Sequence, residues 1–254
     1  MNDIALLELA ADLAAQAGEA ILRVRARGFD TLHKEDKSPV TEADHAAEAL
    51  IVAGLRAATP DIPVVAEEEI AAGHVPLHAS RLWVVDPLDG TREFAAGRDD
   101  FAVCIGLVTD GKPVLGAVGA PVRGEIFAGL VGHGAWKRDA SGRHAIACRV
   151  PPAEGIAVVA SRHYADDPRL QPFLHGRKVA SVLNIGSALK FCRVAEGIAD
   201  LYPRFGRTME WDTAAPQALV EAAGGTVVVF DTGAPLGYGK PDWANPPFLC
   251  SGRI

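Results

Sequence analysis

Residues 82–91 read Leu-Trp-Val-Val-Asp-Pro-Leu-Asp-Gly-Thr, an apolar run that passes directly into two carboxylates. The apolar run predicts a buried strand, and Pro87 and Gly90 indicate a stiff turn after it. Two carboxylates three residues apart could each hold one ion of a pair, with the Leu88 carbonyl pointing the same way. Gly90 allows close approach of a ligand, and the amides of Gly90 and Thr91 could hold a phosphate. Asp-Pro and Asp-Gly are also ordinary turn signals, so this stretch alone leaves a plain turn open.

Three further acids stand at the borders of expected elements. Glu67 follows an apolar run, Asp44 lies in the first turn of an expected helix, and Asp212 opens another helix. Each has a local alternative, namely a solvated acidic loop for Glu67, a capping-box partner for Asp44 and an N-cap for Asp212. Each alternative accounts for one acid alone and leaves the remaining acids unexplained. Carboxylates at strand ends often line a shared crevice, and such hard oxygen ligands suit Mg²⁺ or Mn²⁺ rather than zinc.

The periodicity of apolar residues predicts an α/β chain with two differently organised halves. In residues 1–150 we expect two helices followed by a largely antiparallel sheet, with helices over 3–27 and 41–59 and strands over 62–66, 82–85, 101–108, 113–118 and 125–131. In residues 151–254 we expect alternating strands and helices forming a mixed or parallel sheet, with strands over 156–160, 179–183, 201–205 and 226–230 and helices over 166–175, 187–196 and 212–223. The expected boundary lies near Pro151-Pro152.

Composition and net charge argue against some classes of protein. The chain has 254 residues, a net charge of −7 and 49% hydrophobic residues, which is ordinary globular composition. The acidic balance argues against broad binding of a nucleic-acid polymer, but a small anion needs only a local cationic or metal-bearing pocket. No apolar run is long enough for a membrane span, and the N-terminus does not resemble a signal peptide. We therefore expect a cytoplasmic protein, with peripheral association at the inner membrane left open, and four cysteines present as buried free thiols.

Taken together, the motifs resemble those of the inositol monophosphatase superfamily. The resemblance rests on Glu67-Glu68, on residues 86–91, on Trp211 to Ala215 followed by Ala223-Gly224-Gly225, and on Lys34 to Asp44. It implies a layered αβαβα sandwich and a Mg²⁺-dependent, lithium-sensitive phosphomonoesterase. Several segments look more like one branch, the bacterial 3′(2′),5′-bisphosphate nucleotidases of sulfur metabolism: residues 38–41, 91–94, 186–192, 195–197 and 201–206. Arg92 and Pro216 depart from that branch, where lysine and glycine are usual.

The resemblance also implies roles for individual residues. Glu67, Asp86 and the Leu88 carbonyl would hold one Mg²⁺, and Asp86, Asp89 and Asp212 a second, with a third ion near Glu67 in some members. Thr91 and Asp44 would orient the attacking water, and Glu67 is counted with them as catalytic. The expected substrate-binding residues are Gly90, Thr91, Glu93, Ser161, Gly186, Ser187, Lys190 and Arg204.

Lys190 and Arg204 match positions that bind a second phosphate in the nucleotidase branch. Taken by themselves they could equally be a surface helix lysine and a strand-end arginine. Arg162 and His163 are further candidate cations for that phosphate.

The sequence therefore predicts an enzyme that removes the 3′-phosphate of 3′-phosphoadenosine 5′-phosphate, giving AMP and phosphate. An inositol monophosphatase, or another sugar-phosphate phosphatase of the superfamily, is the alternative within enzymes. A binding protein that has kept the fold and lost turnover is the alternative outside them. The expected partner is a small phosphorylated molecule, and the chain is expected to be a monomer or a homodimer.

Overall fold

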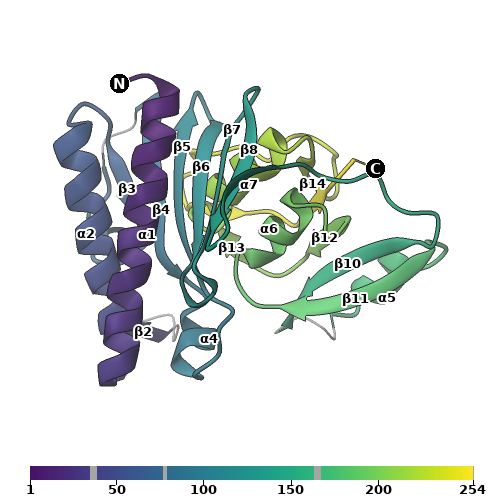
Figure 1. Ribbon diagram of the computed structural model, residues 1–254, viewed down its shortest axis with the longest axis horizontal. Helices are drawn as coiled ribbons and strands as arrows, with labels where there is room; N and C mark the ends of the chain where they lie inside the picture. The colour runs from purple at the N-terminus through teal and green to yellow at the C-terminus, as the bar shows by residue number, and fades with distance from the viewer. Residues whose placement is uncertain (35–38, 77–78, 163–166, 254) are drawn as a thin grey trace.

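The computed structural model describes residues 1–34, 39–76, 79–162 and 167–253. Figure 1 shows helices and sheets in alternating layers. Helices α1 (Asp3–Arg27) and α2 (Glu42–Ala58) cover one face of a seven-stranded sheet, and α6 (Leu189–Ala195) and α7 (Ala214–Ala222) lie between that sheet and a five-stranded one. Helix α5 (Leu170–Leu174) packs on the far face of the second sheet, where Leu170 and Leu174 contact Val158 and Leu201. The αβαβα order expected from the sequence is confirmed.

The two long helices begin and end where their sequences predict. The Asn2 side chain accepts a hydrogen bond from the amide of Ala5 and caps α1, which ends at Gly28 with a φ of 84°. The hydroxyl of Thr41 and the carboxylate of Asp44 form the capping box that starts α2. The apolar stripes of both helices pack against the first sheet in one core.

The first sheet is a meander with one parallel pair at its edge. Its strand order is β3-β4-β5-β6-β7-β8-β9, with β3 and β4 parallel and the other pairs antiparallel. The strands are β3 (Val64–Ala66), β4 (Arg81–Asp89), β5 (Ala102–Thr109), β6 (Lys112–Ala120), β7 (Glu125–Leu130), β8 (Gly134–Asp139) and β9 (Gly142–Ile146). Three short helices interrupt them: α3 (Glu67–Ala71), α4 (Thr91–Ala95) and the 3₁₀ turn η1 (Pro121–Arg123).

The second sheet is mixed. Its order is β11-β10-β12-β16-β14, with β10 parallel to β11 and β12, and β16 antiparallel to both of its neighbours. The strands are β10 (Ile156–Ser161), β11 (Val179–Ile185), β12 (Leu201–Arg204), β14 (Thr226–Val229) and β16 (Phe248–Ser251). Two small two-stranded ladders complete the described fold, β1 (Thr31–His33) with β2 (Pro39–Thr41) and β13 (Thr208–Met209) with β15 (Ala244–Asn245).

Helix α7 belongs to the second half of the chain but packs on the first sheet. Ala215 lies so close to β5 and β6 that a Cβ built on Gly106 would stand 2.6 Å from the Ala215 nitrogen, and one on Gly116 would overlap the Ala215 carbonyl. Glycine at these two strand positions therefore permits the close approach of the helix. This packing joins the two halves, and the boundary near residue 150 stays a prediction.

Several expectations need correction. Strand β4 does not stop at Val85 but continues through Asp89, and residues 226–230 are not the last strand, because β16 follows and is an inner strand of its sheet. The β8–β9 hairpin was not predicted. Helix α5 is shorter than the expected 166–175, and residue 166 lies outside the described residues.

Two other expectations concern single features. All four cysteines are buried and free of disulfides, as predicted. In the described part of the chain, no helix is both long and apolar enough to cross a bilayer.

Candidate active site

Strand β4 carries two of the acids on a bulged backbone. Asp86 pairs with Cys104 and Asp89 with Ala102, so β4 advances three residues while β5 advances two. Side chains alternate between the faces of a regular strand, and residues three apart would point to opposite sides. The extra residue of the bulge resets that alternation, so Asp86 and Asp89 can serve the same site.

The third acid comes from the other half of the chain. Asp212 lies in the turn before α7, and its carboxylate accepts a hydrogen bond from the amide of Met209 at 2.9 Å. It does not cap α7, whose N-cap is Thr213 and makes no side-chain capping bond. The N-cap alternative for Asp212 is therefore wrong.

Asp86, Asp89 and Asp212 form one cluster. Each offers a carboxylate oxygen within 4.8 Å of those of the other two. Asp86 is only 2% exposed, and burial, followed by the negative charges of Glu67, Asp89 and Asp212, raises its pKa well above the usual range. Burial likewise raises the pKa of Asp89 to about 6 and that of Asp212 to about 8. The ionised carboxylates of the cluster therefore repel one another, and a cation bound among them would be favoured.

Glu67 stands beside this cluster at the start of α3. Because β3 pairs in parallel with β4, Ala66 lies opposite Val85, and Glu67 follows beside Asp86. The Lys34 ammonium is 2.6 Å from the carboxylates of both Glu67 and Glu68. Burial opposes the charge of Lys34, but the charge of Glu67 and the two hydrogen bonds raise its pKa overall. Lys34 thus supplies a positive charge beside the acids of α3.

Thr91 and Asp44 form a hydrogen-bonded pair behind the cluster. The Thr91 hydroxyl lies 2.9 Å from one oxygen of Asp44 and 3.1 Å from the Leu88 carbonyl. The other oxygen of Asp44 accepts hydrogen bonds from the amide and hydroxyl of Thr41, both at 2.7 Å. Burial raises the pKa of Asp44 against these hydrogen bonds. Asp44 is therefore both the capping-box partner of Thr41 and the anchor of Thr91.

The turn before α6 brings the second half of the chain against the cluster. The amide of Ala188 donates a hydrogen bond to Asp89. Ser187 adopts a left-handed φ of 54°, which is uncommon for a residue with a side chain. A Cβ on Gly186 would lie 2.8 Å from both the Asp100 carbonyl and the side chain of Glu93, so glycine is needed there.

Lys190 is a buried cation close to this turn. Its side chain is 4% exposed, its ammonium contacts the carbonyls of Ile185 and Ser187, and it lies 5.2 Å from the centre of the Tyr202 ring. Burial lowers its pKa to about 8 against the opposing charge of Asp89. The interpretation of Lys190 as a solvated surface lysine is therefore wrong.

One cavity of about 940 Å³ connects these groups. Every expected site residue except Asp44 lines it: Glu67, Asp86, Leu88, Asp89, Gly90, Thr91, Glu93, Ser161, Gly186, Ser187, Lys190, Arg204 and Asp212. Asp44 reaches the cavity only through Thr91. Arg162 is not among the lining residues, because its guanidinium pairs with Asp100, and His163 lies outside the described residues.

Sequence reasoning missed several residues around the cavity. Arg207 lines it, and its carbonyl accepts a hydrogen bond from Arg204 at 3.0 Å. Two arginines within one short turn were the available signal. The buried Glu210 accepts bonds from the amides of Gly239 and Lys240, both at 2.9 Å, and so fixes the segment beside Asp212. No local pattern marks Glu210, because its partners are distant in sequence.

The donor set fits a hard divalent cation. Carboxylate oxygens from three aspartates lie within 4.8 Å of one another, and Glu67 and Leu88 line the same cavity. Oxygen ligands of this kind are those that Mg²⁺ prefers, whereas zinc favours nitrogen and sulfur. Burial of mutually repelling carboxylates is costly unless a cation offsets it.

The layered fold is shared with solved members of the inositol monophosphatase family. The chain belongs to this family, whose match covers residues 4–252. The 3′(2′),5′-bisphosphate nucleotidase CysQ of Escherichia coli O157:H7 is 45% identical over 97% of this chain and 99% of its own length. The 3′-phosphoadenosine 5′-phosphate phosphatase of Mycobacterium leprae is 36% identical over 95% of this chain and 87% of its own.

Among solved structures, CysQ from Bacteroides thetaiotaomicron superposes with a TM-score of 0.81 and 34% identity, covering 98% of each chain. An inositol monophosphatase from Anabaena superposes with a TM-score of 0.77 and 27% identity, covering 99% of this chain and 92% of that one.

Proposed function

We propose that the protein hydrolyses the 3′-phosphate of 3′-phosphoadenosine 5′-phosphate to give AMP and inorganic phosphate. The observation that carries the proposal is one cavity lined both by a carboxylate cluster and by the cations Lys190, Arg204 and Arg207. A phosphatase acting on a monophosphate needs only the first of these groups. A substrate with a second phosphate also needs positive charge away from the cluster. The nucleotidase relatives support the same substrate.

The carboxylates are the proposed Mg²⁺ ligands. Glu67, Asp86 and the Leu88 carbonyl would hold one ion, and Asp86, Asp89 and Asp212 a second, with a third near Glu67. When bound, Mg²⁺ supplies electrostatic activation of a water molecule and stabilisation of the negative charge on the leaving oxygen. Water is consumed, the bond between phosphorus and the 3′ oxygen breaks, and that oxygen leaves with a proton as the ribose hydroxyl.

Thr91 would orient the attacking water. A hydroxyl carries one hydrogen, and the carboxylate of Asp44 at 2.9 Å is an acceptor for it. The lone pairs of the Thr91 oxygen then remain to accept a hydrogen bond from the water, which fixes its direction of approach. Asp44 is in this scheme a positioning residue, because it acts only through Thr91. The amides of Gly90 and Thr91, which have no acceptor within α4, would bind the phosphate.

Lys190 would bind the second phosphate together with Arg204. An ammonium has three donors, and two of those of Lys190 are directed to the carbonyls of Ile185 and Ser187. The third is available for an anion in the cavity. A phosphate would also hold Lys190 protonated, because it adds negative charge to a site where burial lowers the pKa of the ammonium to about 8. Ser161, Gly186 and Ser187 would lie along the nucleoside.

Initial rates on three substrates test the proposal. With Mg²⁺ present, we expect kcat/KM for 3′-phosphoadenosine 5′-phosphate to exceed that for inositol 1-phosphate and for fructose 1,6-bisphosphate by at least about a hundredfold, the value of one or two charge-assisted contacts. A preference for inositol 1-phosphate would make the protein an inositol monophosphatase instead. Release of no phosphate from any of the three would indicate a binding protein. Monomer or homodimer, and a cytoplasmic or peripheral inner-membrane location, stay predictions from the sequence.

A further inference from the structure

Asp100 lies where the two walls of the cavity meet. A Cβ built on Gly90 would stand 3.1 Å from the Asp100 carbonyl, and one on Gly186 would stand 2.8 Å from it. Gly90 belongs to the wall formed by the first sheet, and Gly186 to the turn that follows β11 of the second sheet. The Asp100 backbone is therefore packed against both walls, beside the place where Gly90 and Ser187 also approach each other.

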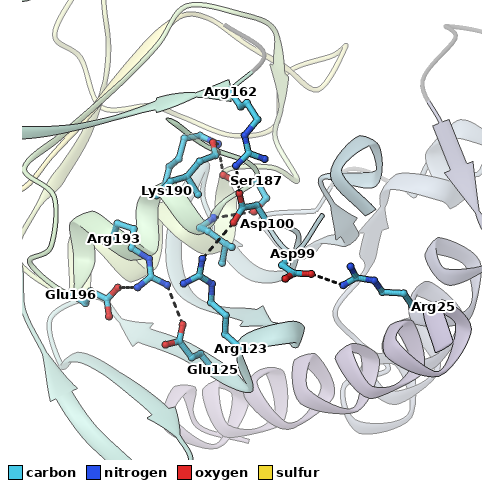
Figure 2. Close-up of polar contacts among 12 residues, drawn as sticks. Arg25, Asp99, Asp100, Arg123, Glu125, Arg162, Ser187, Lys190, Arg193 and Glu196 are labelled. Carbon is cyan, nitrogen blue, oxygen red and sulfur yellow. Dashed lines mark hydrogen bonds and ion pairs between the residues drawn. The ribbon is translucent and has the colours of Figure 1, made fainter. Parts of the chain in front are cut away.

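The side chain of Asp100 contacts two arginines. Figure 2 shows its carboxylate between Arg123 and Arg162, below Ser187 and Lys190. The Arg162 guanidinium is 2.6 Å from one carboxylate oxygen, and that of Arg123 is 3.4 Å from the other. The Asp100 side chain is 15% exposed, and those of Arg162 and Arg123 are 35% and 41% exposed. The contact with Arg162 is thus the shorter and less solvated of the two.

Arg162 connects Asp100 to the second wall. It directly follows Ser161, the last residue of β10, whose buried side chain lines the cavity. In the sheet, Ser161 lies opposite Ile185, the residue before Gly186. A displacement of Arg162 would therefore shift the ends of β10 and β11 together. These strand ends lead into Ser161 and Gly186, which line the part of the cavity proposed to bind the nucleotide.

We propose that the ion pair of Asp100 with Arg162, called here the Asp100 clamp, is a specificity device that holds Ser161 and the Gly186 turn at the spacing required by a nucleotide with a second phosphate. Both residues are positioning residues. Neither residue touches Asp86, Asp89 or Asp212, and the Ala188 amide ties the turn to Asp89 independently of the ion pair, so we expect their effect to fall on substrate binding. This inference rests on the proposed function, because it assigns a role within the same cavity.

The negative charge of Asp100 also favours binding of a second phosphate, through its effect on Lys190. Together with Asp89 and Glu93 it is among the negative charges that favour the protonated form of the buried Lys190. Loss of the Asp100 charge would both release Arg162 and weaken the cation proposed for the second phosphate. Loss of Arg162 alone would do only the first.

Two neighbouring ion pairs offer matched controls. Asp99, adjacent in sequence and 60% exposed, pairs with Arg25 of α1 at 2.9 Å and lies apart from the Arg162 contact (Figure 2). Arg123 shares the Asp100 carboxylate but extends from η1 in the first half of the chain. Neither residue is joined to Ser161. Asp99→Asn and Arg123→Gln therefore remove comparable charges without releasing the second wall.

The experiment compares steady-state kinetics of Asp100→Asn, Arg162→Gln, their double variant and the two controls. For 3′-phosphoadenosine 5′-phosphate we expect KM to rise about tenfold in Arg162→Gln and at least as much in Asp100→Asn, with kcat within about twofold of wild type. The double variant should be no worse than Asp100→Asn, because both changes break one contact. Inositol 1-phosphate kinetics and both controls should be unchanged, and Arg162→Lys should recover part of the loss by keeping the charge.

Three results would overturn the clamp: an equal loss on both substrates, a KM in Arg123→Gln as high as in Arg162→Gln, or additive effects in the double variant. A thermal melt of each variant identifies a general loss of folding, and Arg162→Gln, at a partly exposed position, keeps the test open if Asp100→Asn does not fold. Failure of the proposed function is recognised separately, because wild-type protein would then not hydrolyse the bisphosphate.

Discussion

The carboxylate side of the cavity and its nucleotide side are built in different ways. On the carboxylate side, Asp86, Leu88 and Asp89 belong to a single strand and owe their arrangement to one backbone bulge. On the nucleotide side, Ser161, Lys190 and Arg204 come from three elements, β10, α6 and β12, of which β10 and β12 are neighbours in the second sheet. Arg162, next to Ser161, also pairs with Asp100 of the first half. The backbone of one strand sets the first arrangement, whereas the second depends on how three elements pack and on an ion pair that a single substitution removes.

The largest effect should come from the carboxylate side. Asp212→Asn removes one charge from the proposed Mg²⁺ site, and we expect kcat to fall about a thousandfold or more on every substrate, a loss of about 4 kcal/mol in transition-state stabilisation. Isothermal titration with Mg²⁺ should show weakened binding. Asp242→Asn, at an exposed aspartate, is the control. A loss confined to the bisphosphate would contradict the division between the two sides.

A smaller effect is expected at Thr91. Thr91→Val keeps the shape of the side chain but removes the hydroxyl that lies between Asp44 and the cavity. Loss of an oriented water should lower kcat about a hundredfold with little change in KM. Thr91→Ser, which retains the hydroxyl, should recover most of the rate. If the valine variant instead raised KM at constant kcat, Thr91 would be a binding residue only.

Lys190 tests the nucleotide side. Lys190→Ala should raise KM for 3′-phosphoadenosine 5′-phosphate between about tenfold and a hundredfold, the range of a charge-assisted hydrogen bond. KM for inositol 1-phosphate should stay nearly constant. Lys178→Ala is the control, since that lysine is exposed and its ammonium donates a hydrogen bond to the carbonyl of Ala153, away from the cavity. Equal effects on both substrates would remove Lys190 from the recognition of a second phosphate.

Metal binding should also appear as stability. At a Mg²⁺ concentration one hundred times its dissociation constant, the folded state gains about 2.7 kcal/mol. For a chain of this size that corresponds to a rise in Tm of roughly 5 to 10 °C. The measurement is a thermal melt with EDTA and then with Mg²⁺, and Asp212→Asn should show a reduced shift. A wild-type Tm that Mg²⁺ leaves unchanged would contradict the proposed ligand set.

The smallest expected effect is a pH dependence of the metal-free protein. The pKa of Asp212 is about 8 in the folded state, against 3.8 ordinarily, so between these values the folded protein binds more protons than the unfolded chain. The contribution of Asp212 to stability is therefore complete below its ordinary pKa and is lost as pH rises toward 8. Glu48 and Glu68, whose pKa values burial raises to about 7, act in the same direction. The lowered pKa of Lys190 acts only above pH 8 and in the opposite sense.

The check is a series of melts in EDTA from pH 5 to 8. We expect Tm to fall across this range, less steeply in Asp212→Asn, and to fall less when Mg²⁺ is added. A Tm that rises with pH in EDTA, or an unchanged slope in Asp212→Asn, would show that the carboxylate cluster does not carry this linkage.

The sequence predicted those elements whose bounds are set by local sequence patterns. Helix α1 has the expected bounds, because its apolar stripe is long and Gly28 ends it, and the capping box of Thr41 and Asp44 is present. Strand β16 was missed because Phe248–Ser251 is short, and its place inside the sheet depends on pairing with β12 and β14. Strand β9 was missed because its largely exposed residues lack an alternating apolar pattern.

The candidate site likewise contains residues that the sequence predicted and contacts that it did not. Asp86, Leu88 and Asp89 could be grouped from one contiguous motif, and the resemblance to a family added Asp212 and Lys190. Neither route indicated that Arg162 turns away from the cavity to Asp100, since residues 62 positions apart make that contact. The length of β4 was also underestimated, because Pro87 usually ends a strand, whereas here it lies within a bulge.

The placement of helix α7 has a consequence for the order in which the enzyme is made. Chains are synthesised from the N-terminus, and their early parts can fold before the later ones emerge. The ribosome would release most of the first sheet with Asp86 and Asp89 in place long before it adds Asp212 and the helix that settles over Gly106 and Gly116. A nascent chain therefore lacks the third carboxylate of the cluster for most of its synthesis, and under the proposed function phosphatase activity would begin only after α7 packs on the sheet.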